Sequence, residues 1–202
     1  MGEKWAITDT HFGHANIIKF EKPDGSPIRP GYTPAPTMAY VRFRDITHHD
    51  EALVEQWNRR VGVGDTVYHF GDIGKPLSIM KRLNGRKKLI LGNHDDIHDA
   101  RELRQYFYDI VAWRISQPED GFPVPVVFTH FPLHADERKP AARRINIHGH
   151  IHEKHILRPN GMIDPWYINI CVEHTNHGPV HFDELISMVA LRRKQIEKLG
   201  EA

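Results

Sequence analysis

Short apolar runs in this chain end repeatedly in residues whose side chains bind metal ions. The residues concerned are, in chain order, Asp9 and His11, Asp72, Asn93 and His94, His130, and His150 and His152. In an open α/β sheet, ligands sit beyond the carboxyl ends of the strands, so these five endings can converge on one edge. A metal centre is therefore the leading interpretation.

The spacing and the residue types indicate which metals such a centre would hold. Asp9 and His11 are two residues apart at the end of a strand, so both side chains point to the same side, and His150 and His152 repeat this spacing. A carboxylate and imidazoles, without a thiolate, suit manganese, iron, nickel or zinc better than calcium. Asp72 has two carboxylate oxygens and can offer one to each of two cations.

Two neighbouring cations would support phosphate ester hydrolysis. The amide oxygen of Asn93 is a weak ligand, and its presence favours a second metal close to a shared carboxylate. Two cations roughly 3.5 to 4 Å apart clamp the attacking and leaving oxygens of an in-line phosphoryl displacement, and they lower the pKa of bound water so that hydroxide exists at neutral pH. His94 directly follows Asn93 and is placed to protonate the leaving oxygen or to stabilise its charge.

The motifs resemble, in order and in approximate spacing, those of the calcineurin-like metallophosphoesterase family. They are Asp9-Thr10-His11, Gly71-Asp72, Gly92-Asn93-His94-Asp95, Thr129-His130 and Gly149-His150-Ile151-His152. The stretch from Asn58 to Asp72 resembles the small bacterial and phage-type members in particular. The resemblance implies an α/β fold with mixed sheets, built as a four-layer αββα sandwich with a dinuclear metal site at the carboxyl ends of the strands.

The resemblance also implies two metal positions that share Asp72. The first position takes Asp9, His11, Asp72 and His152. The second takes Asp72, Asn93, His130 and His150. His94 matches the catalytic histidine of the family, which acts on the leaving group rather than on a metal. The implied cofactors are two divalent metal ions, manganese, iron, nickel or zinc, and we expect manganese to support activity.

Four further residues are candidates for holding a ligand in place or for contacting substrate. His14 follows the first motif, and a surface position is an equal alternative. His148 precedes the last motif on the same side of its strand. His134 closely follows His130. Arg143 lies near the same edge, where it is able to pair with a phosphate, and the alternative is a solvent-exposed residue at the start of a strand.

Composition limits the classes of function that remain. The 202 residues favour one domain, and 27 Lys and Arg against 26 Asp and Glu give a net charge of +1, which supplies no global field to attract nucleic acid or an anionic membrane. The only cysteine, Cys171, excludes an internal disulfide and suits a reducing compartment. The sequence has no apolar leader and no stretch of membrane-spanning length, so we expect a cytoplasmic protein without membrane partners. Its oligomeric state is not indicated.

Apolar periodicity predicts strands alternating with helices in the first half and strands joined by turns in the second, hence parallel pairing followed by antiparallel or mixed pairing. Helices are predicted over 14–20, 50–60, 77–83, 99–107 and 183–199. Strands are predicted over 5–8, 66–70, 86–91, 108–115, 124–129, 144–147 and 166–172. Residues 21–44 contain five prolines, and we expect a loop or flap near the active face.

Two alternatives to a phosphoesterase acting on a small molecule or a nucleotide remain open. A nuclease would perform the same chemistry on a polymer, and it needs a basic groove, for which the basic residues between 81 and 88 are suggestive. A non-catalytic scaffold on the same fold would not need its ligands, and this chain retains every ligand position together with His94.

Overall fold

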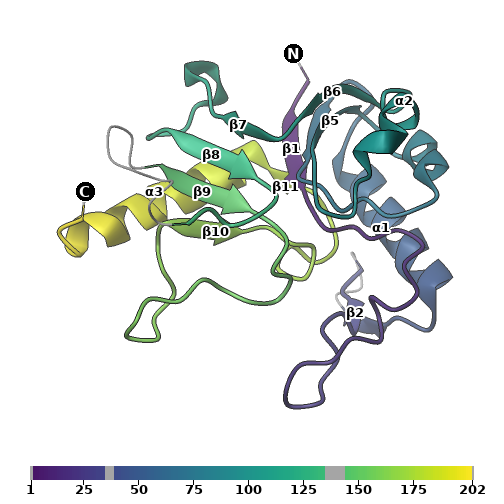
Figure 1. The fold of residues 1–202 in the computed structure, drawn as a ribbon, viewed down its shortest axis with the longest axis horizontal. Helices are drawn as coiled ribbons and strands as arrows, with labels where there is room; N and C mark the ends of the chain where they lie inside the picture. Colours follow the sequence, from purple (N-terminus) through teal and green to yellow (C-terminus); the bar gives the residue numbers. More distant parts are fainter. Residues whose placement is uncertain (1, 35–38, 135–143, 202) are drawn as a thin grey trace.

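The structure, a computed structural model, describes residues 2–34, 39–134 and 144–201, and two sheets dominate it (Figure 1). The larger sheet has the order β11-β1-β4-β5-β6, with β11 Val180–His181, β1 Lys4–Ile7, β4 Thr66–His69, β5 Arg86–Ile90 and β6 Phe107–Val111. The second has the order β10-β9-β8-β7, with β10 Tyr167–Asn169, β9 Ile145–His148, β8 Val126–Thr129 and β7 Trp113–Ile115. The third, smaller sheet pairs β2 Gly31–Tyr32 with β3 Val41–Arg42.

The strand directions are those that the predicted element pattern requires. Strands β1, β4, β5 and β6 run parallel, and β11 pairs antiparallel to β1. In the four-stranded sheet, β8, β9 and β10 run parallel while β7 is antiparallel to β8. The predicted mixture of parallel and antiparallel pairing in an α/β chain is therefore confirmed.

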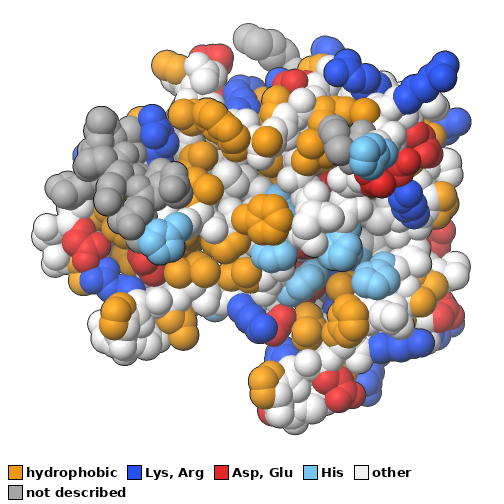
Figure 2. Space-filling view, viewed as in Figure 1, with side chains coloured by type: hydrophobic (Ala, Val, Ile, Leu, Met, Phe, Trp, Pro, Cys, Tyr) orange, Lys and Arg blue, Asp and Glu red, His pale blue; other side chains and the backbone are white. Residues whose placement is uncertain are grey.

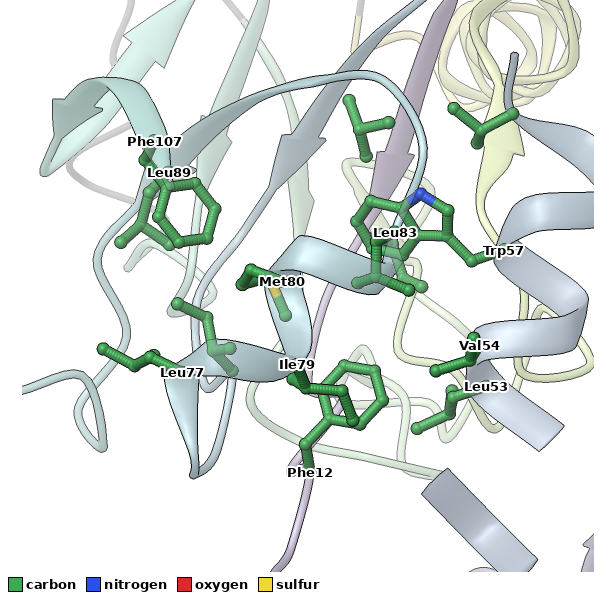
Figure 3. Packing of buried hydrophobic residues seen from close by; sticks show 14 of the residues in the cluster. Phe12, Leu53, Val54, Trp57, Leu77, Ile79, Met80, Leu83, Leu89 and Phe107 are labelled. Atoms are coloured by element: carbon green, nitrogen blue, oxygen red, sulfur yellow. The ribbon is translucent and has the colours of Figure 1, made fainter. Parts of the chain in front are cut away.

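Helix α1 Ile46–Arg60 and the 3-10 helix η1 Leu77–Arg82 bury the outer face of the five-stranded sheet. The other helices are α2 Ala100–Leu103 and α3 Phe182–Lys198, with 3-10 helices η2 Ile97–Asp99 and η3 Pro118–Asp120. Figure 3 shows α1 and η1 packing through Leu53, Trp57 and Met80, which are almost fully buried in one apolar cluster. Ile7 and Val67 of the sheet belong to the same cluster.

A second core lies where the two sheets meet. Ala6 and Tyr68 alternate with the residues of the first cluster, so they point to the opposite face of the sheet. They join Phe128 and Ile147 of the four-stranded sheet, and α3 contributes Leu185 to the same core. A four-layer sandwich would have helices on the outer face of the four-stranded sheet, and the described residues show none there. The four-layer order therefore stays a prediction.

One predicted helix is wrong and another is shorter than predicted. Residues 14–20 form successive turns, in which the Ile17 N–H donates to the His14 carbonyl at 2.9 Å. The predicted helix 99–107 shrinks to η2 and α2, and Phe107 begins β6 with its side chain in the first core. Helix α1 starts earlier than predicted, because Asp45, rather than Asp50, caps it by accepting from the His48 N–H at 2.8 Å.

The ends of the parallel strands meet at one edge, which positions the five motifs. The Asp9 N–H donates to the Gly71 carbonyl and the His11 N–H to the Asp72 carbonyl, both at 3.0 Å, which ties the loop after β1 to the loop after β4. The Gly149 N–H donates to the His130 carbonyl at 2.9 Å and ties the loop after β9 to the loop after β8. Backbone hydrogen bonds therefore hold the motif loops together in pairs, one pair at the edge of each sheet.

Candidate metal centre

The first group of predicted ligands comprises Asp9, His11 and His152. One ligand atom from each lies within 4.8 Å of the others. The His11 Nε2 is 3.7 Å from the Asp9 Oδ1, and the rings of His11 and His152 have centroids 5.3 Å apart. The His152 Nδ1 lies 3.0 Å from the Glu173 Oε1, so its Nε2 is left for a metal.

The second group comprises Asp72, His130 and His150, with ligand atoms again within 4.8 Å of one another. The Asp72 Oδ2 stands between the groups, 3.6 Å from the His11 Nε2 and 3.4 Å from the His130 Nε2. The Asn93 Oδ1 lies 2.9 Å from the His130 Nε2. The structure therefore brings all seven predicted ligands to one place, with Asp72 in the shared position.

Two buried polar atoms show that the centre fits cations. The Asp9 Oδ1 and the His11 Nε2 are buried and have no hydrogen-bond partner. A buried acceptor without a partner is costly, and a cation between these atoms would satisfy both. Oxygen and nitrogen donors without a thiolate fit manganese, iron, nickel or zinc.

Neighbouring histidines keep the two carboxylates ionised despite their burial. Burial opposes ionisation of Asp9, but the nearby His11 side chain and the charge of His130 outweigh burial and hold its pKa well below the ordinary value. Burial also opposes ionisation of Asp72, and the His130 side chain again lowers its pKa. Both carboxylates are therefore ready to accept a cation at neutral pH.

The backbone at the ligands adopts conformations that few side chains tolerate. Five ligands have positive φ angles: Asp9 at 56°, His11 at 48°, Asp72 at 55°, His150 at 70° and His152 at 51°. Such angles are uncommon outside glycine and persist only where the surroundings enforce them. The strain is therefore concentrated where the ligands are positioned.

Two glycines give the carboxylates room. A Cβ at Gly149 would overlap the Asp9 Oδ2, and a Cβ at Gly92 would overlap the Asp72 Oδ1. These are the glycines that directly precede His150 and Asn93 in the motifs. Their role is the close approach of one loop to the carboxylate of another.

An ion pair beneath the centre was not foreseen from the sequence. Arg29 has no solvent exposure, and its Nε and Nη2 donate to the Glu173 Oε1 at 2.9 and 2.6 Å. The Arg29 Nη2 also donates to the Asp9 carbonyl at 2.8 Å, and Nη1 donates to the Thr10 carbonyl at 3.2 Å. Glu173 in turn holds His152, so Arg29 links the backbone of one ligand to the side chain of another.

Arg29 belongs to the segment 21–44 that we predicted as a loop or flap. Its described parts include β2, β3 and a bridge between Glu21 and Pro27. The burial of Arg29 anchors this segment under the metal centre. The local sequence around Arg29 or Glu173 does not predict a role at the metal centre. Their role depends on a contact between residues 144 positions apart in the chain.

Two further residues support the loops from behind. The Asp95 carboxylate accepts from the backbone N–H groups of Asp72 at 2.8 Å, Gly92 at 2.9 Å and Ile73 at 3.0 Å. His69, which is fully buried, lies 3.0 Å from the Thr10 hydroxyl, and its Nδ1 accepts from the Gly71 N–H at 3.2 Å. Burial lowers the His69 pKa to about 3, so this ring is neutral.

The predicted catalytic histidine, His94, lies at the open side of the centre. It is exposed, its ring centroid is 5.5 Å from that of His11, and its N–H donates to the Asp72 Oδ1 at 2.9 Å. His14 also lies next to His11, with ring centroids 5.6 Å apart. Contact of either ring with a bound substrate stays a prediction.

The remaining candidates lie farther from the ligands or outside the described residues. His148 is buried, with its Nδ1 2.8 Å from the Gly149 carbonyl and its ring 5.9 Å from that of Tyr167. His134 is exposed. Arg143 lies outside the described residues. Roles for these three in holding ligands or substrate stay predictions.

Residues 45–172 match the family description "Calcineurin-like phosphoesterase superfamily domain". This match covers more than half of the chain and includes the motifs from Asp72 to His152. The chain belongs to the calcineurin-like phosphoesterase superfamily. The resemblance predicted from the motifs is thereby confirmed.

Relatives of this calcineurin-like protein occur in phages and archaea. The gene 66 protein of Mycobacterium phage D29 is 29% identical, with 94% of this chain and 96% of the relative covered. The uncharacterized protein MJ1445 of Methanocaldococcus jannaschii is 28% identical, with 94% and 92% covered. The crystal structure of AQ665 from Aquifex aeolicus, titled a protein of unknown function, matches with a TM-score of 0.62 at 24% identity, covering 93% of this chain and 100% of that one. This last likeness shows the fold alone.

None of the helices in the described residues is both long enough and apolar enough to span a membrane.

Proposed function

We propose that this protein is a phosphoesterase that depends on two divalent metal ions and hydrolyses phosphomonoester or phosphodiester bonds. The observation that carries the proposal is the position of the Asp72 Oδ2 between the His11 Nε2 at 3.6 Å and the His130 Nε2 at 3.4 Å. A single carboxylate between two groups of donors is what a pair of neighbouring cations requires. Membership of the calcineurin-like superfamily supports the same reaction class.

Seven residues would hold the two cations. The first would take Asp9, His11, Asp72 and His152, and the second Asp72, Asn93, His130 and His150. When bound, such ions lower the pKa of water and neutralise charge on phosphoryl oxygens. We favour manganese for assays, and iron, nickel and zinc suit the same donors.

His94 would act on the leaving group. Its backbone N–H is fixed by the Asp72 Oδ1 at 2.9 Å, while its ring stays exposed beside His11. An imidazole so placed can donate a proton to the departing ester oxygen. The bond between that oxygen and phosphorus breaks as water supplies the new oxygen, so a monoester releases alcohol and phosphate, and a diester releases alcohol and a monoester.

The contacts of the basic cluster weigh against a nuclease, which remains the second candidate. Arg82 pairs with Glu51, and Lys88 lies 3.3 Å from Asp109. Lys87 is buried and donates to the Leu83 carbonyl at 2.7 Å. These cations are already engaged, so they form a poor groove for a polyanion. A non-catalytic scaffold is disfavoured by the complete set of ligand side chains. A cytoplasmic location is part of the proposal.

The test is hydrolysis of matched monoester, diester, cyclic nucleotide and oligonucleotide substrates by protein loaded with manganese. We expect turnover that is abolished by Asp72→Ala and by Asn93→Ala, and slowed at least about a hundredfold by His94→Ala with metal binding retained. Asp96→Ala is the matched control, since Asp96 is an exposed carboxylate in the same loop. A protein that binds two ions and hydrolyses none of these esters would refute the proposal.

A further inference from the structure

An apolar pocket of about 390 Å³ opens on the outer face of the four-stranded sheet, beside the metal centre. The pairing of β7 with β8 forms its floor. Trp113 lies opposite Thr129 and Ile115 opposite Val127, so all four share one face of the sheet. All four line the pocket, whereas Phe128, which lies between Val127 and Thr129, points into the second core.

The pocket adjoins the metal centre, because two adjacent residues, His130 and Phe131, border both. His130 lines the pocket and also belongs to the ligand group around Asp72. Phe131 lines the pocket too, and its ring centroid lies 4.9 Å from that of His130 and 4.6 Å from that of His150. Figure 2 shows histidine side chains gathered beside hydrophobic ones on this face. A group attached to a phosphate at the metal centre would therefore be within reach of the pocket.

Two aromatic rings at the pocket are left unusually open to solvent. Trp113 is 57% exposed and Phe131 is 46% exposed, although both neighbour a buried sheet. Exposed aromatic side chains that line a concave site commonly stack on flat aromatic groups of a ligand. Scattered exposed side chains would need no such explanation, but these two line the same pocket.

The charges around the pocket indicate what the ligand carries. Among the described lining residues there is no carboxylate, and Arg144 is the only one that is always charged. The Arg144 Nε is buried and donates to no group. The pocket is therefore suited to a ligand group that is uncharged or that is attached close to an anion. The Arg144 Nε is available to donate one hydrogen bond to it.

We propose that this pocket binds the flat, uncharged aromatic group of the phosphoester substrate, with its ring between Trp113 and Phe131 and its phosphate at the metal centre. The proposal rests on the proposed function and narrows its substrates to aryl esters and nucleotides. Esters of small alkyl alcohols and of sugars leave the pocket empty.

The test measures binding of non-hydrolysed ligands by calorimetry to protein loaded with manganese. Phenylphosphonate is compared with methylphosphonate, and the phosphonate analogue of adenosine 5′-monophosphate is compared with that of ribose 5-phosphate, a methylene group replacing the ester oxygen in both analogues. The members of each pair differ by one aromatic group. We expect the aromatic member of at least one pair to bind about tenfold more tightly, the value of one stacking interaction. The first pair reports an aryl group and the second a nucleobase.

Trp113→Ala and Phe131→Ala should each remove most of this preference, because each weakens binding of the aromatic member of a pair more than binding of its partner. Tyr108→Ala, at an exposed aromatic residue on β6 outside the pocket, should leave the preference intact. Equal affinities within both pairs for the native protein would overturn the proposal, as would a preference that survives both pocket substitutions.

The outcome also separates this proposal from the proposed function. Hydrolysis of generic esters without any aromatic preference would overturn the pocket and leave the phosphoesterase standing. An aromatic preference without hydrolysis of any ester would support the pocket and refute the enzyme.

Discussion

His152 and His130 each have one ring nitrogen held by a partner, which leaves the other nitrogen facing the predicted metal positions. The His152 Nδ1 faces Glu173, and the His130 Nδ1 lies 2.8 Å from the Phe70 carbonyl. Partners of this kind orient the ring and raise its basicity, and losing one commonly weakens metal binding by about 10-fold to 100-fold. The ligand residues alone therefore do not determine the affinity for metal.

Glu173→Gln should weaken binding of one of the two ions by about tenfold or more, because His152 loses its charged partner. Titration calorimetry with manganese resolves the affected ion from the unaffected one. Glu102→Gln, at an exposed carboxylate on α2, provides the control and should change neither. Equal affinities in the native protein and in Glu173→Gln would show that Glu173 serves the fold only.

Gly149→Ala should weaken metal binding by about tenfold or more, because the added Cβ displaces the Asp9 carboxylate that it would overlap. Gly64→Ala is the matched control, since a Cβ at Gly64 meets open space. The same calorimetric titration checks both variants. If Gly149→Ala bound metal as tightly as the native protein, the Asp9 carboxylate could move without weakening metal binding, and its observed position would not be required.

At the scale of elements, the sequence predicts the strands better than the helices. Strands such as β8 carry apolar runs because both faces are buried, and this signal is local. The helix predicted over 14–20 was wrong, since the segment forms successive turns and only Ile17 among its apolar residues is fully buried. Segment 21–44 was predicted as a loop or flap, and the buried Arg29 within it was not predicted.

Arg29→Met should lower the free energy of unfolding by about 3 to 5 kcal/mol, because it leaves Glu173 buried without its cationic partner. Urea unfolding of the metal-free protein measures this change. Arg82→Met breaks an exposed pair with Glu51 and should cost less than about 1 kcal/mol. Equal costs for the two variants would show that the 21–44 segment is not anchored through Arg29.

For the molecule as a whole, buried neutral histidines link stability to pH. Burial lowers the pKa of His49 to about 2 and that of His177 to about 3, from the model-peptide value of 6.5. Below pH 6.5 the unfolded chain therefore takes up protons that the folded chain does not. The free energy of unfolding then falls as the pH falls, whereas above pH 6.5 these two groups have no effect.

Replacing His177 by leucine should remove one of these protons. Between pH 6.5 and pH 5, we expect the native protein to lose about 2 kcal/mol more stability than His177→Leu. Urea unfolding of both metal-free proteins across this range measures the difference. Parallel pH profiles would contradict a neutral, buried His177.

The sequence by itself predicted the seven ligands and the role of His94 and identified the family, because each motif is a short local pattern at the end of an apolar run. Their convergence followed from a general property of α/β sheets. Only the tertiary structure revealed the ion pair of Arg29 with Glu173, the positive φ angles at five ligands and the pocket at Trp113 and Phe131. These features depend on contacts between distant segments, and burial and contact across the chain leave no periodic trace in the sequence.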